Sequence, residues 1–104
     1  VKRNQPIRIE FLNPDATPHN FVLVQPDSLE EVGLAANEMA KDPIAAQNGQ
    51  FIPRSNKIIA HTKMLKQGEK EFLRFKAPKK PGIYHYLCSF PGHWAIMKGN
   101  LIVK

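Results

Sequence analysis

Residues 88–97 of the chain read CSFPGHWAIM, and they place a thiol, an imidazole and a thioether in one short stretch. The spacing is C-x4-H-x3-M, from Cys88 through His93 to Met97, and a loop of that length can turn all three side chains toward one point. A soft thiolate, an imidazole and a weak thioether form a ligand set that suits copper. Cys88 is the only cysteine, so the chain has no internal disulfide. The stretch therefore predicts a copper site that needs one more histidine from elsewhere.

Each of these three residues also has an ordinary interpretation. A lone buried cysteine is usually a small hydrophobic residue, a histidine in a loop is usually solvated, and a methionine is usually part of the core. What favours ligation is the joint spacing, together with the position of Cys88 at the end of a predicted strand, facing the Pro91-Gly92 turn. Copper would hold Cys88 as the thiolate, which makes it the strongest ligand.

Three histidines outside the loop are candidates for the further ligand: His19, His61 and His85. His85 lies three residues before Cys88 in the same predicted strand, so side-chain alternation turns it to the opposite face. His19 begins a predicted strand after a proline-containing turn, with the aromatic Phe21 on the same face. The pattern favours His19, and His61, near the end of another predicted strand, remains a candidate on this ground alone.

Length and composition place the chain among ordinary globular domains. A chain of 104 residues predicts a single domain, residues 1–104, and 42% hydrophobic residues can form one core. No apolar run is long enough to span a membrane. The chain begins with Val1 rather than methionine, so we expect that an upstream segment has been removed and that the domain is excised from a longer chain.

The formal net charge of +6 is carried by scattered lysines and arginines. Without a long basic run or aromatic residues interleaved with basic ones, the charge does not indicate nucleic-acid binding. It indicates a solubilising charge that weakly steers the protein toward acidic partners.

Most of the chain reads as short strands between turns. Period-two alternation and bounding turn residues predict strands over residues 7–11, 19–25, 58–62, 70–77, 83–88 and 100–104. In the second of these, His19, Phe21 and Leu23 share one face, and the residues between them share the other. Many short strands at this spacing predict an antiparallel sandwich or barrel.

A helical insertion of residues 28–47 interrupts the strands. Ser28 and Glu31 have the spacing of a capping box, and apolar residues follow at helical spacing. Asp42-Pro43 is expected to end this helix, and a further short helical turn is expected over residues 44–47.

Four stretches make the chain similar to the cupredoxins, the blue copper proteins, and in particular to the azurin-like and auracyanin-like members. They are PHNFVL at 18–23, IAHTK at 59–63 with GEK at 68–70, GIYHYLC at 82–88, and the loop that runs from Cys88 to Leu101. The likeness extends from about Ile7 to Lys104, and the loop carries its most specific motif.

This resemblance implies an all-β fold, an antiparallel Greek-key β-sandwich with a helical flap. It implies one type 1 copper ion that cycles between Cu(I) and Cu(II), held closely by His19, Cys88 and His93 and weakly by Met97. His61 matches a surface histidine that is not a ligand in the family. The Pro18 carbonyl stands where the family has a glycine carbonyl close to copper, so a weak contact is expected there.

Further expectations concern the surroundings of the copper. The backbone amides of Asn20 and Phe90 are expected to donate to the thiolate, and the Asn20 side chain is expected to tie two loops together. We expect electrons to pass through the edge of His93, within an apolar patch of Phe90, Pro91, Gly92 and Trp94. For Trp94 the alternative is a packing role. A small apolar patch suits a transient encounter.

The resemblance also implies a partner and a location. The expected partner is a redox protein such as a c-type cytochrome or a copper oxidase, with no nucleic acid and no membrane span in this chain. The expected location is periplasmic or otherwise extracytoplasmic, with a membrane tether through a missing segment as one form. Azurins have an N-terminal disulfide and a further first strand, neither of which this sequence contains, so we expect one exposed sheet edge.

Five other kinds of protein or site share parts of this pattern. A copper carrier or sensor would have the same loop without reversible electron transfer, and an electron-relay domain would serve a larger redox enzyme. A multicopper enzyme needs additional paired histidines, and a dinuclear copper centre needs two cysteines. Zinc could bind three of the residues, but the axial methionine argues against it. No open ligand position is expected, so the sequence does not indicate an enzyme.

Overall fold

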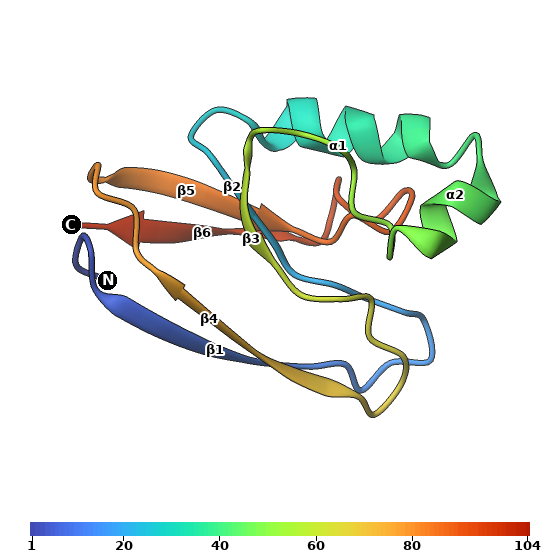
Figure 1. Cartoon of the computed structure of the whole chain (residues 1–104), viewed down its shortest axis with the longest axis horizontal. Coiled ribbons are helices and arrows are strands. Elements are labelled where there is room, and N and C mark those ends of the chain that lie inside the picture. Colours follow the sequence, from blue (N-terminus) through green and yellow to red (C-terminus); the bar gives the residue numbers. More distant parts are fainter.

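A computed structural model describes all residues, 1–104, as an antiparallel β-sandwich with two helices along one side (Figure 1). The elements in chain order are β1 (Pro6–Leu12), β2 (Val22–Val24), α1 (Leu29–Met39), α2 (Pro43–Asn48), β3 (Ile58–His61), β4 (Lys70–Lys76), β5 (Gly82–Leu87) and β6 (Lys98–Val103). The predicted all-β class with a helical insertion is confirmed.

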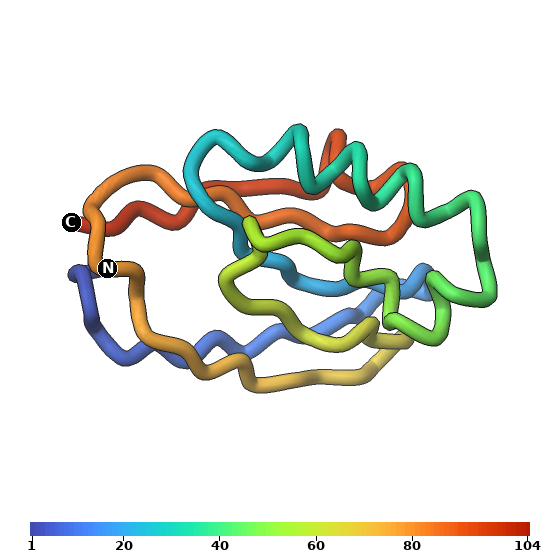
Figure 2. The backbone as a smooth tube through the Cα atoms, turned by 45° about the horizontal axis from the view of Figure 1, so that its top comes forward, coloured from blue at the N-terminus to red at the C-terminus, as the bar shows by residue number.

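The strands form two sheets, one of β1 and β4 and one in the order β3-β2-β5-β6. All neighbouring strands are antiparallel, with Ile9 opposite Leu73 in the first sheet and Tyr84 opposite Leu101 in the second. Figure 2 shows the two layers lying over each other. Sequentially distant strands are therefore neighbours, which brings the ends of several loops together.

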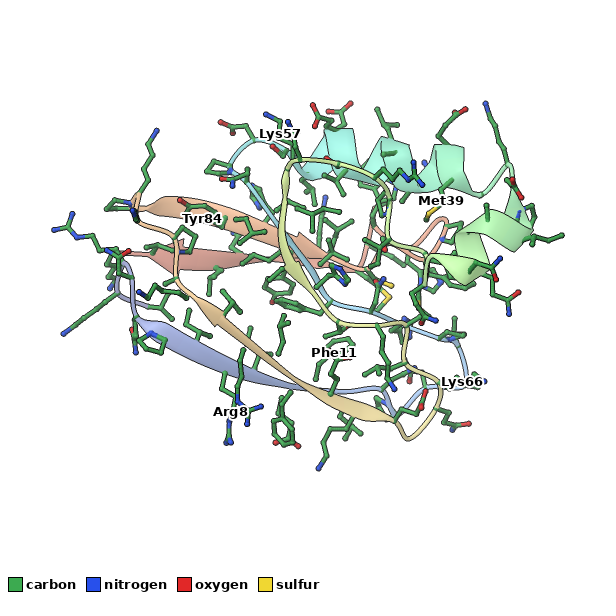
Figure 3. All side chains as sticks on the ribbon, in the orientation of Figure 1. Arg8, Phe11, Met39, Lys57, Lys66 and Tyr84 are labelled. Atoms are coloured by element: carbon green, nitrogen blue, oxygen red, sulfur yellow. The ribbon has the colours of Figure 1, made fainter.

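The main core fills the space between the two sheets. Both sheets contribute buried side chains to it: Phe21, Leu23, Leu73, Tyr84 and Val103. Phe11 points from β1 into this core, whereas Arg8 on the same strand points away from the sandwich (Figure 3). Burying one such large apolar side chain contributes about 1.5–3 kcal/mol to stability.

A second core lies on the outer face of the larger sheet, beneath α1. Val22, Val24 and Leu87 from β2 and β5 pack there against Val32 of α1. Residues that alternate along β2 thus enter different cores, Leu23 the inner one and its neighbours the outer one. The predicted division of this strand into two faces is confirmed.

The segment before β2 is extended but does not join the sheet ladder as predicted for residues 19–21. It pairs instead with the segment after β3. The backbone amide of His19 donates to the Leu65 carbonyl at 3.1 Å and the Leu65 amide to the His19 carbonyl at 2.8 Å, while the Thr62 amide donates to the Phe21 carbonyl at 2.9 Å. A register shift at Leu23/Val24 accompanies this short ladder. His19 is therefore held to Leu65 by a pair of backbone hydrogen bonds.

The helical insertion is present as two helices, but its expected capping box is wrong. Ser28 precedes α1 with φ −113° and ψ 3°, and its hydroxyl donates to the Pro26 carbonyl at 3.2 Å instead of accepting from the helix. The chain enters the helix through Asp27 in the left-handed region, which directs the serine away from the first turn. Asp42 does cap a helix. It directly precedes Pro43, the first residue of α2, and its side chain accepts from the Ala45 amide.

The two chain ends lie together, opposite the end of the sandwich where the turn before His19 and the loop of residues 88–97 meet (Figure 1). The Val1 carbonyl accepts from the Lys104 amide at 2.8 Å, and the Arg3 amide donates to the Lys104 carbonyl at 3.0 Å. Neither helix has the length and apolar character needed to cross a membrane.

Candidate metal centre

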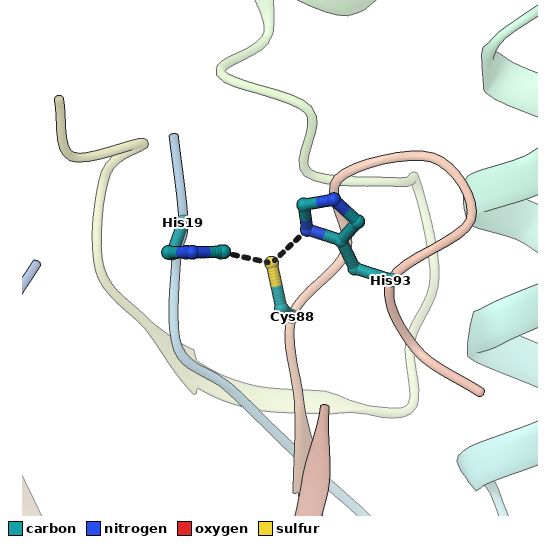
Figure 4. Close-up of side chains that lie close together, drawn as sticks. All are labelled: His19, Cys88 and His93. Carbon is teal, nitrogen blue, oxygen red and sulfur yellow. Dashed lines mark hydrogen bonds between the residues drawn. The ribbon is translucent and has the colours of Figure 1, made fainter. Parts of the chain in front are cut away.

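A thiol and two imidazoles converge at one end of the sandwich. The ligand atoms of His19, Cys88 and His93 all lie within 4.8 Å of one another. The Cys88 sulfur lies between the two rings, 3.8 Å from Nδ1 of His19 and 3.6 Å from Nδ1 of His93 (Figure 4). Residues 69 positions apart in the chain thus face each other.

These separations fit a metal ion bonded to all three atoms. Metal–sulfur and metal–nitrogen bonds of about 2.3 and 2.0 Å, as in zinc sites, place sulfur and nitrogen roughly 3.5 Å apart at a tetrahedral angle. The donor set itself, one thiolate with two imidazoles, is that of a blue-copper centre. The chemistry and the spacing of these side chains therefore agree with a single copper ion.

The loop that carries His93 is a defined turn. Pro91 and Gly92 occupy its central positions, Gly92 has φ 85°, and the His93 amide donates to the Phe90 carbonyl at 3.0 Å. Proline followed by a residue with positive φ is typical of a type II turn, and that second position favours glycine. The motif FPGH therefore shapes the backbone that presents His93.

The loop is closed by two further backbone hydrogen bonds. The Cys88 amide donates to the Met97 carbonyl at 3.0 Å, and the Met97 amide donates to the His93 carbonyl at 2.8 Å. Cys88 and Met97 line the same small cavity. The three loop residues predicted as ligands are consequently held in one rigid unit.

A buried polar network joins this loop to the His19 segment. The Asn20 side chain accepts from the Ser89 amide at 2.8 Å and donates to the Ser89 hydroxyl at 2.8 Å. The Ser89 hydroxyl in turn donates to the Phe51 carbonyl at 2.5 Å. Asn20 and Ser89 are buried, and none of their buried side-chain nitrogen and oxygen atoms lacks a hydrogen-bond partner. Three separate segments are thereby fixed around the site.

Burial keeps the thiol neutral while no metal is bound. It raises the pKa of Cys88, and hydrogen bonds from the backbone amides of Asn20 and Phe90 lower it by a smaller amount. A cation reverses this balance, because a coordinated thiol is deprotonated outright. The backbone amides of Asn20 and Phe90 would then stabilise the negative charge on the Cys88 sulfur.

The imidazole of His93 also favours its neutral form. Burial lowers the pKa of His93, and the neighbouring His19 lowers it further. A neutral imidazole keeps a lone pair available for a metal ion. His19 is buried and His93 is half-buried, so His93 is the imidazole nearer the surface.

An aromatic ring packs against His93. The Phe90 ring lies 4.7 Å from the His93 ring and 5.2 Å from the Phe51 ring, measured between centroids. Ile96 is 83% exposed in the same loop. The loop that carries His93 therefore places an aromatic ring against it and exposes an apolar side chain.

Trp94, for which a place in the apolar patch and a packing role were both open, lies against the helical insertion. Its half-buried ring packs against Gly33 of α1 and the outer core, and its Nε1 donates to the Asn37 side chain at 3.3 Å. This environment fits the packing role, because Gly33 has no side chain and leaves room on α1 for the indole ring.

The other two histidines lie outside the cluster. Nδ1 of His61 pairs with the Thr62 carbonyl at 2.9 Å at the end of β3, and Nδ1 of His85 pairs with the Asn100 side chain at 2.8 Å. Pro18 is half-buried next to His19. The histidines that converge on Cys88 are the two favoured by the sequence pattern.

One contact of the cluster had no signal in the sequence. The Asp15 carboxylate lies 3.2 Å from Nε2 of His19, the nitrogen that faces away from Cys88. A carboxylate four residues before a histidine predicts contact in a helix, but here the two are joined by a turn. Only the folded turn brings them together.

Comparison with known proteins identifies the class to which this fold and site belong. A family model described as copper binding proteins, plastocyanin/azurin family, matches residues 3–104. Azurin from Achromobacter denitrificans is 39% identical over 92 residues, 83% of this chain and 56% of that protein. Auracyanin-B from Chloroflexus aurantiacus is 37% identical over 105 residues, 96% of this chain and 42% of that protein.

A solved structure supports the same conclusion. Dithionite-reduced auracyanin from Roseiflexus castenholzii superposes with a TM-score of 0.82 at 38% identity, covering 100% of this chain and 81% of that one. A sandwich that presents a cysteine and two histidines at one end is the architecture of a mononuclear copper protein. The chain belongs to the plastocyanin/azurin family of copper-binding proteins. It spans about half the length of the two relatives described above.

Proposed function

We propose that this chain transfers single electrons through one type 1 copper ion. The observation that carries the proposal is the convergence of the buried Cys88 thiol with the Nδ1 atoms of His19 and His93 in a member of a copper-binding family. Bound copper supplies a one-electron couple between Cu(I) and Cu(II). The chain supplies the ligands, their orientation and the exclusion of water.

His19, Cys88 and His93 are the proposed close ligands. Met97 is the proposed weak axial ligand, and the Pro18 carbonyl is a further weak contact. The backbone amides of Asn20 and Phe90 are proposed to donate to the bound thiolate, which adjusts the reduction potential. Support for Met97 comes from the hydrogen bonds that tie its backbone to Cys88 and His93.

The rigid surroundings of these ligands favour fast electron transfer. The ligand segments are held by backbone pairing with Leu65, by the type II turn and by the buried Asn20–Ser89 network. Ligands that cannot move far impose little reorganisation when the charge of the ion changes. A domain of residues 1–104 with one such site needs no substrate position, and we propose no bond-making catalysis.

The proposed path for the electron is the outer edge of His93. The Phe90 ring packs against His93, Pro91 and Gly92 precede His93 in the loop, and Trp94 follows it and packs against α1. A small apolar contact of this kind suits a transient complex with a redox protein such as a c-type cytochrome or a copper oxidase. The net charge of +6 would favour a partner with an acidic face. We place this activity outside the cytoplasm, in the periplasm or an equivalent compartment.

The deciding experiment is a titration of the metal-free protein with Cu(II), followed in the visible spectrum. We expect an intense thiolate-to-copper band at one equivalent, bleached by ascorbate and restored by an oxidant. The Cys88→Ser variant is the control and should bind copper without that band. A wild-type protein that binds copper without the band would contradict the proposal.

The same titration separates electron transfer from copper carriage or sensing. A carrier would form the band but release its copper, or fail to recover the band, on repeated reduction and oxidation. Retention of copper through many cycles supports the electron-transfer function.

A further inference from the structure

His19 has two ring nitrogens with different neighbours. Nδ1 faces the Cys88 sulfur at 3.8 Å, and Nε2 lies 3.2 Å from a carboxylate oxygen of Asp15. His93 has no equivalent carboxylate partner, since its one polar side-chain contact is the one between Nδ1 and Cys88. The two imidazoles of the site are therefore held in different ways.

Asp15 is exposed, yet its backbone is fixed by a buried residue. Its amide donates to the side-chain oxygen of Asn13 at 2.9 Å, and Asn13 is 1% exposed. The Asn13 side-chain amide donates to the carbonyls of Thr17 and Leu65, both at 2.9 Å. Asn13 thus shapes the turn that carries Asp15 and links it to Leu65.

Leu65 connects the same turn to His19. Its amide and carbonyl form the two backbone hydrogen bonds with His19. The Asp15 side chain is 67% exposed, whereas that of His19 is 9% exposed. The exposed Asp15 carboxylate therefore contacts the buried His19 ring. The turn that carries Asp15 and the backbone of His19 are both hydrogen-bonded to Leu65.

From this geometry we propose that Asp15 is a positioning residue of the copper site, acting through His19. Its carboxylate accepts the Nε2–H of His19, which keeps the proton on that nitrogen and leaves the Nδ1 lone pair directed at the site. A carboxylate in this position fixes the tautomer and the orientation of the ring. This inference rests on the proposed copper function, with His19 as a ligand through Nδ1.

The negative charge of Asp15 has a second consequence. A carboxylate behind a ligand favours Cu(II) over Cu(I), because the more highly charged ion gains more from a nearby anion. The charge and the hydrogen bond can be separated by substitution. Asp15→Asn removes the charge and keeps an acceptor oxygen, and Asp15→Ala removes both.

The first test uses the metal-free protein and nitrogen-15 NMR of its histidine rings. In the wild type and in Asp15→Asn we expect the His19 proton on Nε2. In Asp15→Ala we expect a measurable population with the proton on Nδ1. A wild-type His19 that carries its proton on Nδ1, or a tautomer unchanged in Asp15→Ala, would overturn the proposal.

The second test uses the copper-loaded protein. Asp15→Asn should raise the reduction potential, by a change of up to about tenfold in the relative affinity for the two oxidation states, which equals about 59 mV. Asp15→Ala should in addition weaken Cu(II) binding by about 10–100-fold. The matched control is Glu10→Gln, which removes one carboxylate from the exposed ion pair with Lys70.

Glu10→Gln should leave both the potential and the affinity at their wild-type values. An Asp15→Asn potential equal to that of Glu10→Gln would show that the charge of Asp15 has no special effect on the copper site and would refute the proposal. The NMR result does not depend on bound copper. A failure of the copper function is therefore distinguishable from a failure of the Asp15 assignment.

Discussion

The indole ring of Trp94 occupies the space that a Cβ atom at Gly33 would need. The ring carbons lie closer to that position than a side-chain atom can approach, and Nε1 is held by Asn37 one turn further along α1. Trp94 follows His93 directly, so this contact connects the helical insertion to the loop of the metal centre. A helix that sequence analysis treats as a separate insertion thus supports the ligand loop.

The first prediction concerns this contact. Gly33→Ala should lower the free energy of unfolding by about 1–3 kcal/mol, because the new methyl group displaces the indole. In a Trp94→Ala background the same substitution should instead stabilise the protein by up to about 1 kcal/mol, since alanine is the better helix former. Urea unfolding of the four proteins forms a double-mutant cycle. Equal effects of Gly33→Ala in both backgrounds would show that the ring does not depend on this glycine.

A second prediction concerns the buried network between the His19 segment and the ligand loop. Asn20→Ala should destabilise the metal-free protein by about 1–3 kcal/mol, because the buried Ser89 amide loses its acceptor. Asn100→Ala is the matched control. Asn100 is exposed and pairs only with His85, so the loss should stay within about 0.5 kcal/mol. Chemical unfolding measures both, and similar losses would argue against the special role of Asn20.

The histidines provide a third prediction. His61→Ala and His85→Ala should retain the copper band and its intensity, because both side chains pair away from Cys88. His19→Ala and His93→Ala should each change or abolish it. Visible and electron paramagnetic resonance spectra of the four copper-loaded variants provide the measurement. Loss of the band in His61→Ala would mean that His61, not His19, is the ligand.

The fourth prediction follows from the raised pKa of Cys88 in the metal-free protein. Burial raises the pKa of this thiol, so as pH rises past about 8.5 the unfolded chain loses its proton before the folded one does. The unfolded state then binds fewer protons, and the stability present below that pH falls as pH increases. Unfolding at pH 7 and pH 9.5, compared with Cys88→Ser, isolates the effect. The gap between the two proteins should change between the two pH values, and a constant gap would refute the prediction.

Local patterns in the sequence account for the strands and for the types of ligand residue in the site. Alternation along residues 7–11 and 70–77 reflects one buried and one exposed face, which is a property of each strand by itself. The FPGH turn is equally local, since proline and glycine restrict their own backbone. Cys88, His93 and Met97 could be grouped from spacing because one loop carries them.

Tertiary structure decided the contacts made between distant segments. The sequence identified the donor types, but His19 reached Cys88 only through pairing with Leu65, and Asp15 reached His19 only through a turn held by buried Asn13. The sequence could not assign Trp94 to surface or core, because its position depends on the packing of its ring against Gly33 of α1. Such contacts depend on the relative placement of whole elements, which side-chain burial between the sheets determines. The sequence by itself therefore determined the ligand types and the strand faces, and packing decided which residues support them.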